Sequence, residues 1–380
     1  MYDYKLDFYQ NMLTITILIV TYIIIFIVGS RQKNNILIVT LIVLWHTFFS
    51  LVYFIFSLYS VSDAKGYYRV SITEHTFSLA PGTAFLNFLT SVFTQGIGSN
   101  YLNTALIFNI AGSLGLVLLY LSIKDYLKNL PWYYVLIVFI PSMSFWSASL
   151  SKDSISFFAV CLFLYAIATN RKPSILIPMA FLSMFMVRPH IAAMFLASYV
   201  VYFILKAKVH ILFKLLTVPF IMFGLLLSVS FVESYIGLEY GSAKGYTDYI
   251  NQRETVSQVG GSSVDISSMS YPMKIFTYIF RPLPFEAHNL ISLINSFENT
   301  VLLLFTIYIL FKSRFNLKPF FKDKNLWLFT YLFLTSSVLA LTTANLGIAT
   351  RQKWMFMPVF LYLLIYALYD YKVRKNKVCQ

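Results

Sequence analysis

Long apolar segments recur from one end of the chain to the other, and short polar segments separate them. We expect eleven membrane-spanning helices, because a helix of about 20 apolar residues crosses the hydrocarbon core of a bilayer. Their approximate ranges are 11–29, 36–59, 102–123, 132–149, 154–169, 174–188, 190–206, 211–232, 288–311, 326–344 and 354–370. The pattern therefore predicts an all-α, polytopic integral membrane protein with a single membrane domain over residues 1–380.

Two longer polar segments are expected to form large loops on the outer side of the membrane. Residues 60–101 contain the sequence SDAKGYYRVSITEH. Residues 233–287 contain GGSSVDISSMS, whose glycine and serine content is typical of a flexible connection.

The lysines and arginines fix the predicted orientation. Most of the 29 fall in one set of alternate loops, whereas the other set holds about as many acids as bases. Cytoplasmic loops are the ones enriched in lysine and arginine, so the N-terminus is predicted outside and the C-terminus in the cytoplasm. The net charge of +14 is explained by this topology, and we expect no nucleic-acid partner, which would need a clustered basic face.

Five cations are not explained by this orientation, because they adjoin apolar helices on the outer side. They occur in FWSASLSKDS, MVRPH, YIFRPLPFEAHN and TANLGIATRQKW, and are Lys152, Arg188, Arg281, Arg351 and Lys353. Ionisable residues at membrane depth are functional candidates. A proline follows Arg188 and Arg281, which predicts a helix break at each. Any one of these cations could instead pair with a nearby acid or with a lipid headgroup. Several together would suit a membrane-anchored anion such as a lipid diphosphate.

Transfer of a sugar from such a lipid needs a base to accept a proton from the acceptor hydroxyl. The candidates on the outer side are Asp63, His190 and Glu286, although a loop carboxylate is more often simply solvated. Asp153 could act as a base or could equally be the partner of Lys152 or Arg188. Two polar residues inside spans have structural interpretations, a satisfied buried histidine for His46 and a paired or protonated acid for Glu298.

Motifs for other chemistries do not occur in the sequence. It has no glycine-rich nucleotide motif, no HExxH or CxxC pair and no GxSxG elbow. We therefore expect no cofactor and no metal. Because Cys161 lies in an apolar segment and Cys379 in the basic tail, we expect no disulfide framework.

The segments PSMSFWSASLSKD, MVRPH, FRPLPFEAHN and NLGIATRQKWMFMP, with the helix number and outer loops, resemble the bacterial Wzy-type O-antigen and capsule repeat-unit polymerases. The resemblance implies a GT-C-like fold in the bacterial inner membrane. It implies polymerisation of lipid-linked oligosaccharide by transfer from undecaprenyl diphosphate on the outer face. By position, Arg188, Arg281 and Arg351 would bind the diphosphate, with Lys152 and Lys353 assisting. SDAKGYY is similar to the first outer loop of GT-C transferases, which ranks Asp63 first among the bases.

Three other functions stay open. A GT-C transferase could add a single sugar from a polyprenyl phosphate donor. A lipid-linked oligosaccharide flippase is a second alternative, although no internal duplication is visible. A membrane acyltransferase would depend on His190. The partners expected for the polymerase are the undecaprenyl-diphosphate-linked oligosaccharide, membrane lipids and a chain-length regulator.

Overall fold

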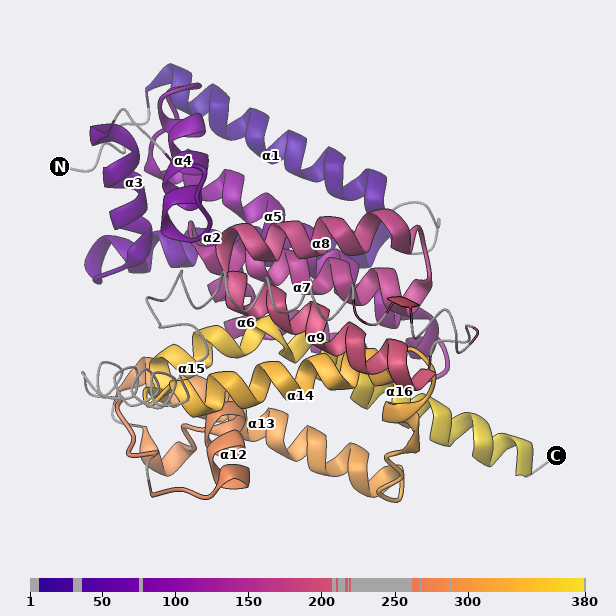
Figure 1. Cartoon of the computed structure of the whole chain (residues 1–380). Coiled ribbons are helices and arrows are strands. Elements are labelled where there is room, and N and C mark those ends of the chain that lie inside the picture. The colour runs from indigo at the N-terminus through magenta and orange to yellow at the C-terminus, as the bar shows by residue number, and fades with distance from the viewer. Residues whose placement is uncertain are drawn as a thin grey trace. The chain divides into compact units, whose positions relative to one another are not determined.

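The computed structural model describes residues 7–29, 36–74, 78–206, 210, 216–217, 219, 262–266, 268–287 and 289–378. In these ranges the chain is helical, apart from connecting segments and an isolated β-bridge between Ser263 and Asn345. The chain divides into two compact units, unit 1 over Met1–Arg188 and unit 2 over Pro189–Gln380 (Figure 1).

Unit 1 is built around helix α5, whose residues are mostly buried. Helices α1, α2 and α7 pack against α5, and α8 packs against α7. Its elements are α1 (Phe8–Gly29), α2 (Ile36–Tyr59), α3 (Asp63–Thr73), α4 (Thr83–Thr94), α5 (Tyr101–Leu127), the 3₁₀ helix η2 (Trp132–Phe139), α6 (Pro141–Ser147), α7 (Lys152–Thr169) and α8 (Pro173–Val187).

Unit 2 is organised around helix α14, which packs against α9, α12 and α16. A hydrogen bond from the Trp327 indole to the Ser198 hydroxyl, 3.1 Å, joins α14 to α9. The elements are α9 (Pro189–Lys206), α12 (Tyr271–Phe280), η3 (Pro284–Glu286), α13 (Leu290–Lys312), η4 (Lys318–Phe321), α14 (Asn325–Thr342), α15 (Leu346–Gln352), η5 (Lys353–Met355) and α16 (Met357–Val378).

Seven helices of the described chain are long and apolar enough to cross a membrane, or eight if a bent pair formed by Leu346–Met355 and Met357–Lys375 counts as one span. The seven are α1, α2, α5, α7, α9, α13 and α14. These helices and the bent pair correspond to the predicted spans other than 132–149, 174–188 and 211–232. The prediction of a polytopic, all-helical membrane protein is confirmed, whereas a total of eleven spans stays a prediction.

The three remaining predicted spans are broken, too short or outside the described residues. Residues 132–149 form a 3₁₀ helix and a short α-helix, because Pro141 has no N–H to continue the first helix and instead begins the second. The segment 174–188 is helix α8, whose 15 residues reach roughly 22 Å, less than the hydrocarbon core. The segment 211–232 lies almost wholly outside the described residues.

The two polar segments contain helices where they are described. Residues 60–101 fold into α3 and α4, so this expected loop is largely helical. Of residues 233–287, the part from 262 onward contains α12 and η3, and residues 233–261 lie outside the described residues.

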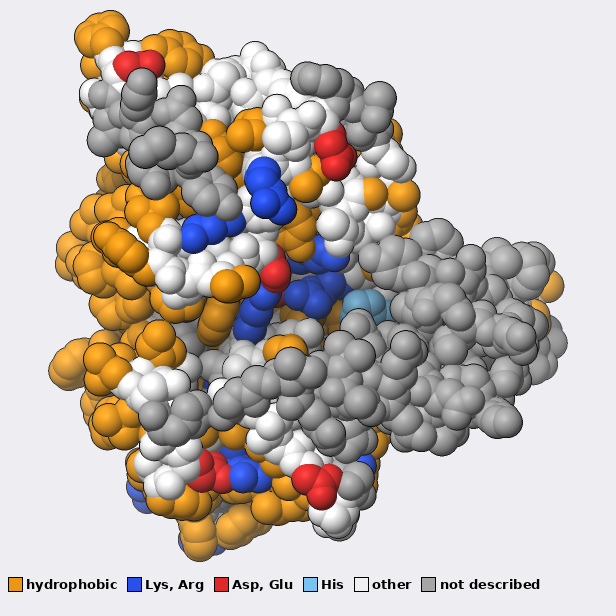
Figure 2. All heavy atoms as spheres, turned by 90° about the vertical axis from the view of Figure 1, so that its left-hand side faces the viewer, with side chains coloured by type: hydrophobic (Ala, Val, Ile, Leu, Met, Phe, Trp, Pro, Cys, Tyr) orange, Lys and Arg blue, Asp and Glu red, His pale blue; other side chains and the backbone are white. Residues whose placement is uncertain are grey.

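Apolar side chains cover much of the outer surface of the helices. Phe8 of α1 is 79% exposed and Leu290 of α13 is 72% exposed, and many neighbours on these two helices are also uncovered. Figure 2 shows such hydrophobic side chains at the surface. A surface of this kind is stable against lipid and not against water, which supports a membrane-embedded protein.

A buried polar cluster fastens α2 to α5 and to the end of α6. The His46 ring contacts the side-chain oxygen Oδ1 of Asn109 through Nδ1, 2.5 Å, and the Ser147 hydroxyl through Nε2, 2.9 Å. One turn on, the Ser50 hydroxyl donates to the Ala148 carbonyl, 3.3 Å. His46 is therefore a satisfied buried histidine, as predicted, and its cluster fixes the residues that lead into α7.

We predict that Gly112→Ala destabilises unit 1. A Cβ at Gly112 would lie 2.3 Å from the Ser147 carbonyl oxygen and 2.4 Å from His46 Cε1, and overpacking of this kind costs about 1–3 kcal/mol. Thermal unfolding of the purified protein in detergent should show a lower Tm. The control is Gly66→Ala, because a Cβ at Gly66 in α3 meets nothing within 4 Å. An equal effect of both substitutions would contradict the packing argument.

Candidate functional site

The corner between α6 and α7 is held by serine hydroxyls. Ser151 is the N-cap of α7, and its hydroxyl accepts a hydrogen bond from the Asp153 N–H, 3.1 Å. The Ser149 and Ser151 hydroxyls lie 2.6 Å apart, and Ser149 donates to the Trp146 carbonyl, 2.8 Å. This capping starts α7 at Lys152 and places Asp153 in its first turn.

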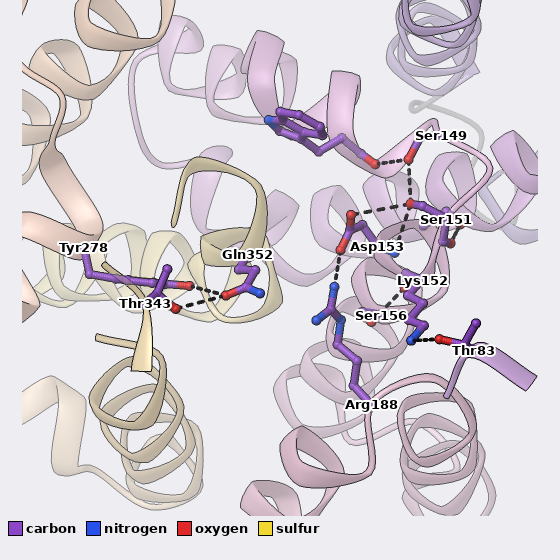
Figure 3. Close-up of polar contacts among 12 residues, drawn as sticks. Thr83, Ser149, Ser151, Lys152, Asp153, Ser156, Arg188, Tyr278, Thr343 and Gln352 are labelled. Carbon is purple, nitrogen blue, oxygen red and sulfur yellow. Dashed lines mark hydrogen bonds and ion pairs between the residues drawn. The ribbon is translucent and has the colours of Figure 1, made fainter. Parts of the chain in front are cut away.

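A buried ion pair joins this corner to the end of α8. Arg188 Nη2 donates to Asp153 Oδ1 at 2.6 Å, and the two side chains are only 12% and 6% exposed (Figure 3). Arg188 ends α8 with φ −146° and ψ 77°, which confirms the helix break expected from Pro189. Arg188 Nε is buried and has no hydrogen-bond partner among the residues that the structure describes.

The start of α4 meets the same corner. Lys152 Nζ donates to the Thr83 hydroxyl, 2.8 Å (Figure 3). The preceding residue, Gly82, donates its N–H to the Met186 carbonyl near the end of α8, 2.8 Å. Gly82 has φ 96°, a conformation that side-chain-bearing residues rarely adopt. Three helices from separate parts of unit 1 therefore bring Lys152 and Arg188 to one place. Together with Asp153 and Thr83 we call them the outer cluster, after the orientation that the sequence predicts.

The outer cluster favours an anion. Helix N-termini carry about half a positive charge and C-termini about half a negative charge, and here α4 and α7 begin while α6 and α8 end, so the helix ends cancel. With two cations and one acid, the net charge is about +1. Arg188 offers a planar fork and Lys152 a point charge, which is the combination that binds phosphate groups.

Asp63, ranked first among the predicted bases, is exposed in the first turn of α3. The next turns of α3 are anchored, because Ala64 and Tyr68 belong to a buried cluster with Tyr101 of α5 and Leu150 of the α6–α7 corner. The helix that carries Asp63 is thus packed against the corner that carries the outer cluster.

In unit 2, Arg281 and Glu286 pair with each other. Arg281 Nε donates to Glu286 Oε1 at 2.7 Å, and Nη2 donates to the same oxygen. The other oxygen accepts from the Leu283 N–H, 2.7 Å. Burial raises the pKa of Glu286. The hydrogen bonds from Arg281 and Leu283, with the Arg281 charge, lower it by more than burial raises it, so the pKa lies below its usual 4.5. Such a carboxylate is a weaker base than one in water.

Lys353 lies inside unit 2 and not at its surface. It is 1% exposed, and its Nζ donates to Asn299 Oδ1 at 2.5 Å. The Asn299 amide donates in turn to the Pro282 carbonyl, 3.2 Å, beside Arg281. Glu298 adds a favourable charge interaction with Lys353. Lys353 therefore stabilises the turn that holds Arg281.

Arg351 and His190 complete the predicted residues of unit 2. Arg351 is half-buried in α15, which packs against α12. Its neighbour Gln352 accepts from the Tyr278 and Thr343 hydroxyls at 3.5 and 3.4 Å (Figure 3). His190 is half-buried in the first turn of α9.

The structure brings together only some of the predicted diphosphate-binding residues. Lys152 and Arg188 share the outer cluster in unit 1. Arg281, Arg351 and Lys353 lie on packed elements of unit 2. A single anion bound by Arg188, Arg281 and Arg351 stays a prediction, because the first belongs to one unit and the others to the second.

Sequence reasoning missed Thr83 and Asn299. No sequence pattern points to Thr83, because the lysine that it contacts, Lys152, lies 69 residues further along the chain. Asn299, next to Glu298 in an apolar helix, could have been found as a buried amide needing partners. In the described parts of the chain, no group of three or more His, Cys, Asp or Glu residues could hold a metal ion.

No protein-family model, curated protein or solved structure matches this chain.

We predict that Asp153→Asn and Arg188→Gln each lower the Tm strongly, while the double variant is less destabilised than the sum of the two. Removing one partner leaves a buried charge unpaired, which costs about 3–5 kcal/mol. The control is the exposed pair Lys128–Asp125, with side chains 67% and 65% exposed, whose removal should cost about 1 kcal/mol or less. Additive effects at Asp153 and Arg188 would show that their contact is not a stabilising pair.

We predict that the stabilisation by Glu286 depends on pH. Because its folded-state pKa is lowered, its contribution is complete above pH 4.5 and is lost as pH falls through the folded-state value. Thermal unfolding should find Glu286→Gln less stable than the wild type at neutral pH, with a difference that shrinks in acid. The exposed Glu74→Gln variant gives the baseline. A difference that grows in acid would contradict the pairing with Arg281.

Proposed function

We propose that this protein is a membrane glycosyltransferase that polymerises lipid-linked oligosaccharide repeat units, taking the growing glycan from undecaprenyl diphosphate. In this proposal it acts on the outer face of the bacterial inner membrane. The observation that supports it is the outer cluster, where Lys152 and the buried Arg188–Asp153 pair meet at the start of α7. A cationic site at the end of apolar helices suits a substrate with a charged head and a lipid tail.

Each residue of the outer cluster has a role in donor binding. Asp153 uses one oxygen to orient the Arg188 guanidinium, 2.6 Å away. The remaining donors of Arg188, including the unpartnered Nε, would contact diphosphate oxygens. Lys152, held by Thr83, would add a second positive charge.

The reaction follows from this placement. A hydroxyl of the acceptor repeat unit attacks C1 of the donor sugar, and the bond between C1 and the diphosphate oxygen breaks. The electron pair stays on that oxygen, where Arg188 and Lys152 stabilise the developing charge. The hydroxyl proton passes to a base. An inverting displacement is the simplest stereochemistry for one such step.

Among the three candidate bases, Asp63 fits this role best. Glu286 is engaged by Arg281 and Leu283, which weakens it as a base. Asp63 is exposed on a helix packed beside the outer cluster. His190 remains the alternative. Donor-binding roles for Arg281, Arg351 and Lys353 rest on the sequence resemblance, and Lys353 would act through Asn299 and the turn at Pro282.

The test is polymerisation in vitro. Purified protein in detergent is mixed with an undecaprenyl-diphosphate-linked repeat unit, and the products are resolved on a gel. We expect a ladder of lengths with the wild type. Lys152→Gln should slow ladder formation about 10- to 100-fold, since a charged hydrogen bond contributes about 1.5–3 kcal/mol. Arg188→Lys should slow it as well, because lysine keeps the charge and loses the planar fork.

The matched control is Lys312→Gln, which removes an exposed cation from the last turn of α13. It should leave the ladder unchanged, and all variants should keep the wild-type Tm within a few degrees. A single added sugar would favour a monosaccharide transferase, and lipid crossing without a new bond would favour a flippase. A wild-type ladder from Lys152→Gln would remove the outer cluster from the reaction.

A further inference from the structure

A turn rich in cations and apolar side chains joins α13 to α14 in unit 2 (Figure 1). Both helices are long and apolar enough to cross a membrane. Because α13 ends at Lys312 and α14 begins at Asn325, the residues between them lie at a membrane surface. In the orientation that the lysines and arginines predict, this is the cytoplasmic surface. We call residues 311–324 the basic turn.

The basic turn carries more positive charge than its surroundings balance. It contains five cations and one acid, namely Lys312, Arg314, Lys318, Lys322, Lys324 and Asp323. Helix α9 also ends here, because Tyr202 in its last turns stacks on Trp327 of α14. The ends of α9 and α13 and the start of α14 together add about −0.5. The charge of Asp370 in α16 is offset by Arg374, 2.5 Å away. A surplus of about +3.5 remains, whichever cation pairs with Asp323.

Large apolar side chains are exposed between these cations. Phe311 is 66% exposed, Phe315 56%, Leu317 46% and Phe321 41%. The enrichment of cytoplasmic loops in lysine and arginine explains the charge but not these side chains, whose exposure to water costs free energy. The boundary between headgroups and acyl chains suits both kinds of residue, since rings enter the acyl region while cations stay at the headgroups.

The local structure of the basic turn holds its apolar side chains outward. Pro319 and Phe320 are buried and anchor the middle of the turn. Arg314 and Phe315 have φ of 55° and 52°, a left-handed conformation that bulky residues rarely adopt. The Phe315 N–H donates to the Leu310 carbonyl, 2.8 Å, which fixes this conformation at the end of α13. Backbone strain of this kind is typical of functional positions, and here it leaves a phenylalanine ring exposed.

We propose that the basic turn binds anionic lipid headgroups of the cytoplasmic leaflet. Arg314, Lys318 and Lys322 contact the phosphates, while Phe315 and Leu317 enter the upper part of the acyl chains. A soluble acidic partner would balance the cations and leave the apolar side chains in water, so a lipid surface fits better. The inference does not rest on the proposed glycosyl transfer, because no residue of the outer cluster takes part in it.

The test measures the Tm of the delipidated full-length protein in neutral detergent as lipid is added, because a ligand of the folded state raises the Tm. Phosphatidylglycerol should act at a lower concentration than zwitterionic phosphatidylcholine. The variant Arg314→Gln/Lys318→Gln/Lys322→Gln should need on the order of 100-fold more phosphatidylglycerol for the same shift, because each cation contributes about a fivefold effect. The charge-retaining variant Arg314→Lys/Lys318→Arg/Lys322→Arg should respond like the wild type.

A second variant separates the apolar contribution from the charge. Phe315→Asn/Leu317→Ser should weaken the response to both lipids by a similar factor and keep the preference for phosphatidylglycerol. Asparagine is chosen for position 315 because it tolerates the left-handed conformation. Equal responses of this variant and the wild type to both lipids would show that these side chains do not enter the bilayer and would overturn that part of the proposal.

The matched control removes three exposed cations from unit 1, as Lys128→Gln/Arg171→Gln/Lys172→Gln. It should keep most of the preference for phosphatidylglycerol. An equal loss of preference in this control, or an unchanged preference in the Arg314/Lys318/Lys322 variant, would overturn the assignment to the basic turn. Polyglutamate, a soluble acidic polymer, should give no comparable shift in Tm. A shift as large as that from phosphatidylglycerol would overturn the lipid assignment and indicate an acidic protein partner.

Discussion

The ion pair between Arg188 and Asp153 organises the end of unit 1 at which α7 begins. A charge buried beside apolar helices is tolerated only when it is paired, and here each partner is nearly covered. The pair ties the end of α8 to the start of α7. The Gly82–Met186 bond then attaches α4 to α8, and Lys152 reaches Thr83. One electrostatic requirement thus determines where three helices meet and which donors remain for a ligand.

The apolar pattern predicted most of the long helices, because a segment that crosses a bilayer must satisfy its backbone hydrogen-bonding groups internally and a helix does so. Where the structure differs from the apolar pattern, the reason is also physical. Residues 132–139 form a 3₁₀ helix that ends before Pro141, because an apolar pattern indicates burial but does not specify the type of helix. Residues 60–101 contain polar residues throughout, yet Ala64, Tyr68 and Ser71 recur at helical spacing and form the buried face of α3. The polar residues on the exposed side of α3 hid this pattern in the sequence.

The candidate site was predictable as a set of cations, and among its contacts the pairing of Asp153 with Arg188 or Lys152 could be named. Pro189 indicated the break at Arg188. Other partners come from far away in the sequence, as with Lys152 and Thr83, 69 residues apart. Lys353 shows the opposite case. Its place beside an apolar helix on the predicted outer side suggested a binding residue, but the ammonium is buried and donates to Asn299, a neutral amide in α13.

Helix direction makes the two ends of unit 1 electrically different. Where α4 and α7 begin, their N-termini lie beside Lys152 and Arg188. At the opposite end, α1, α5 and α7 finish, so three C-termini lie near Lys124 and Arg171. A diphosphate, which carries more than one negative charge, therefore suits the end where α4 and α7 begin.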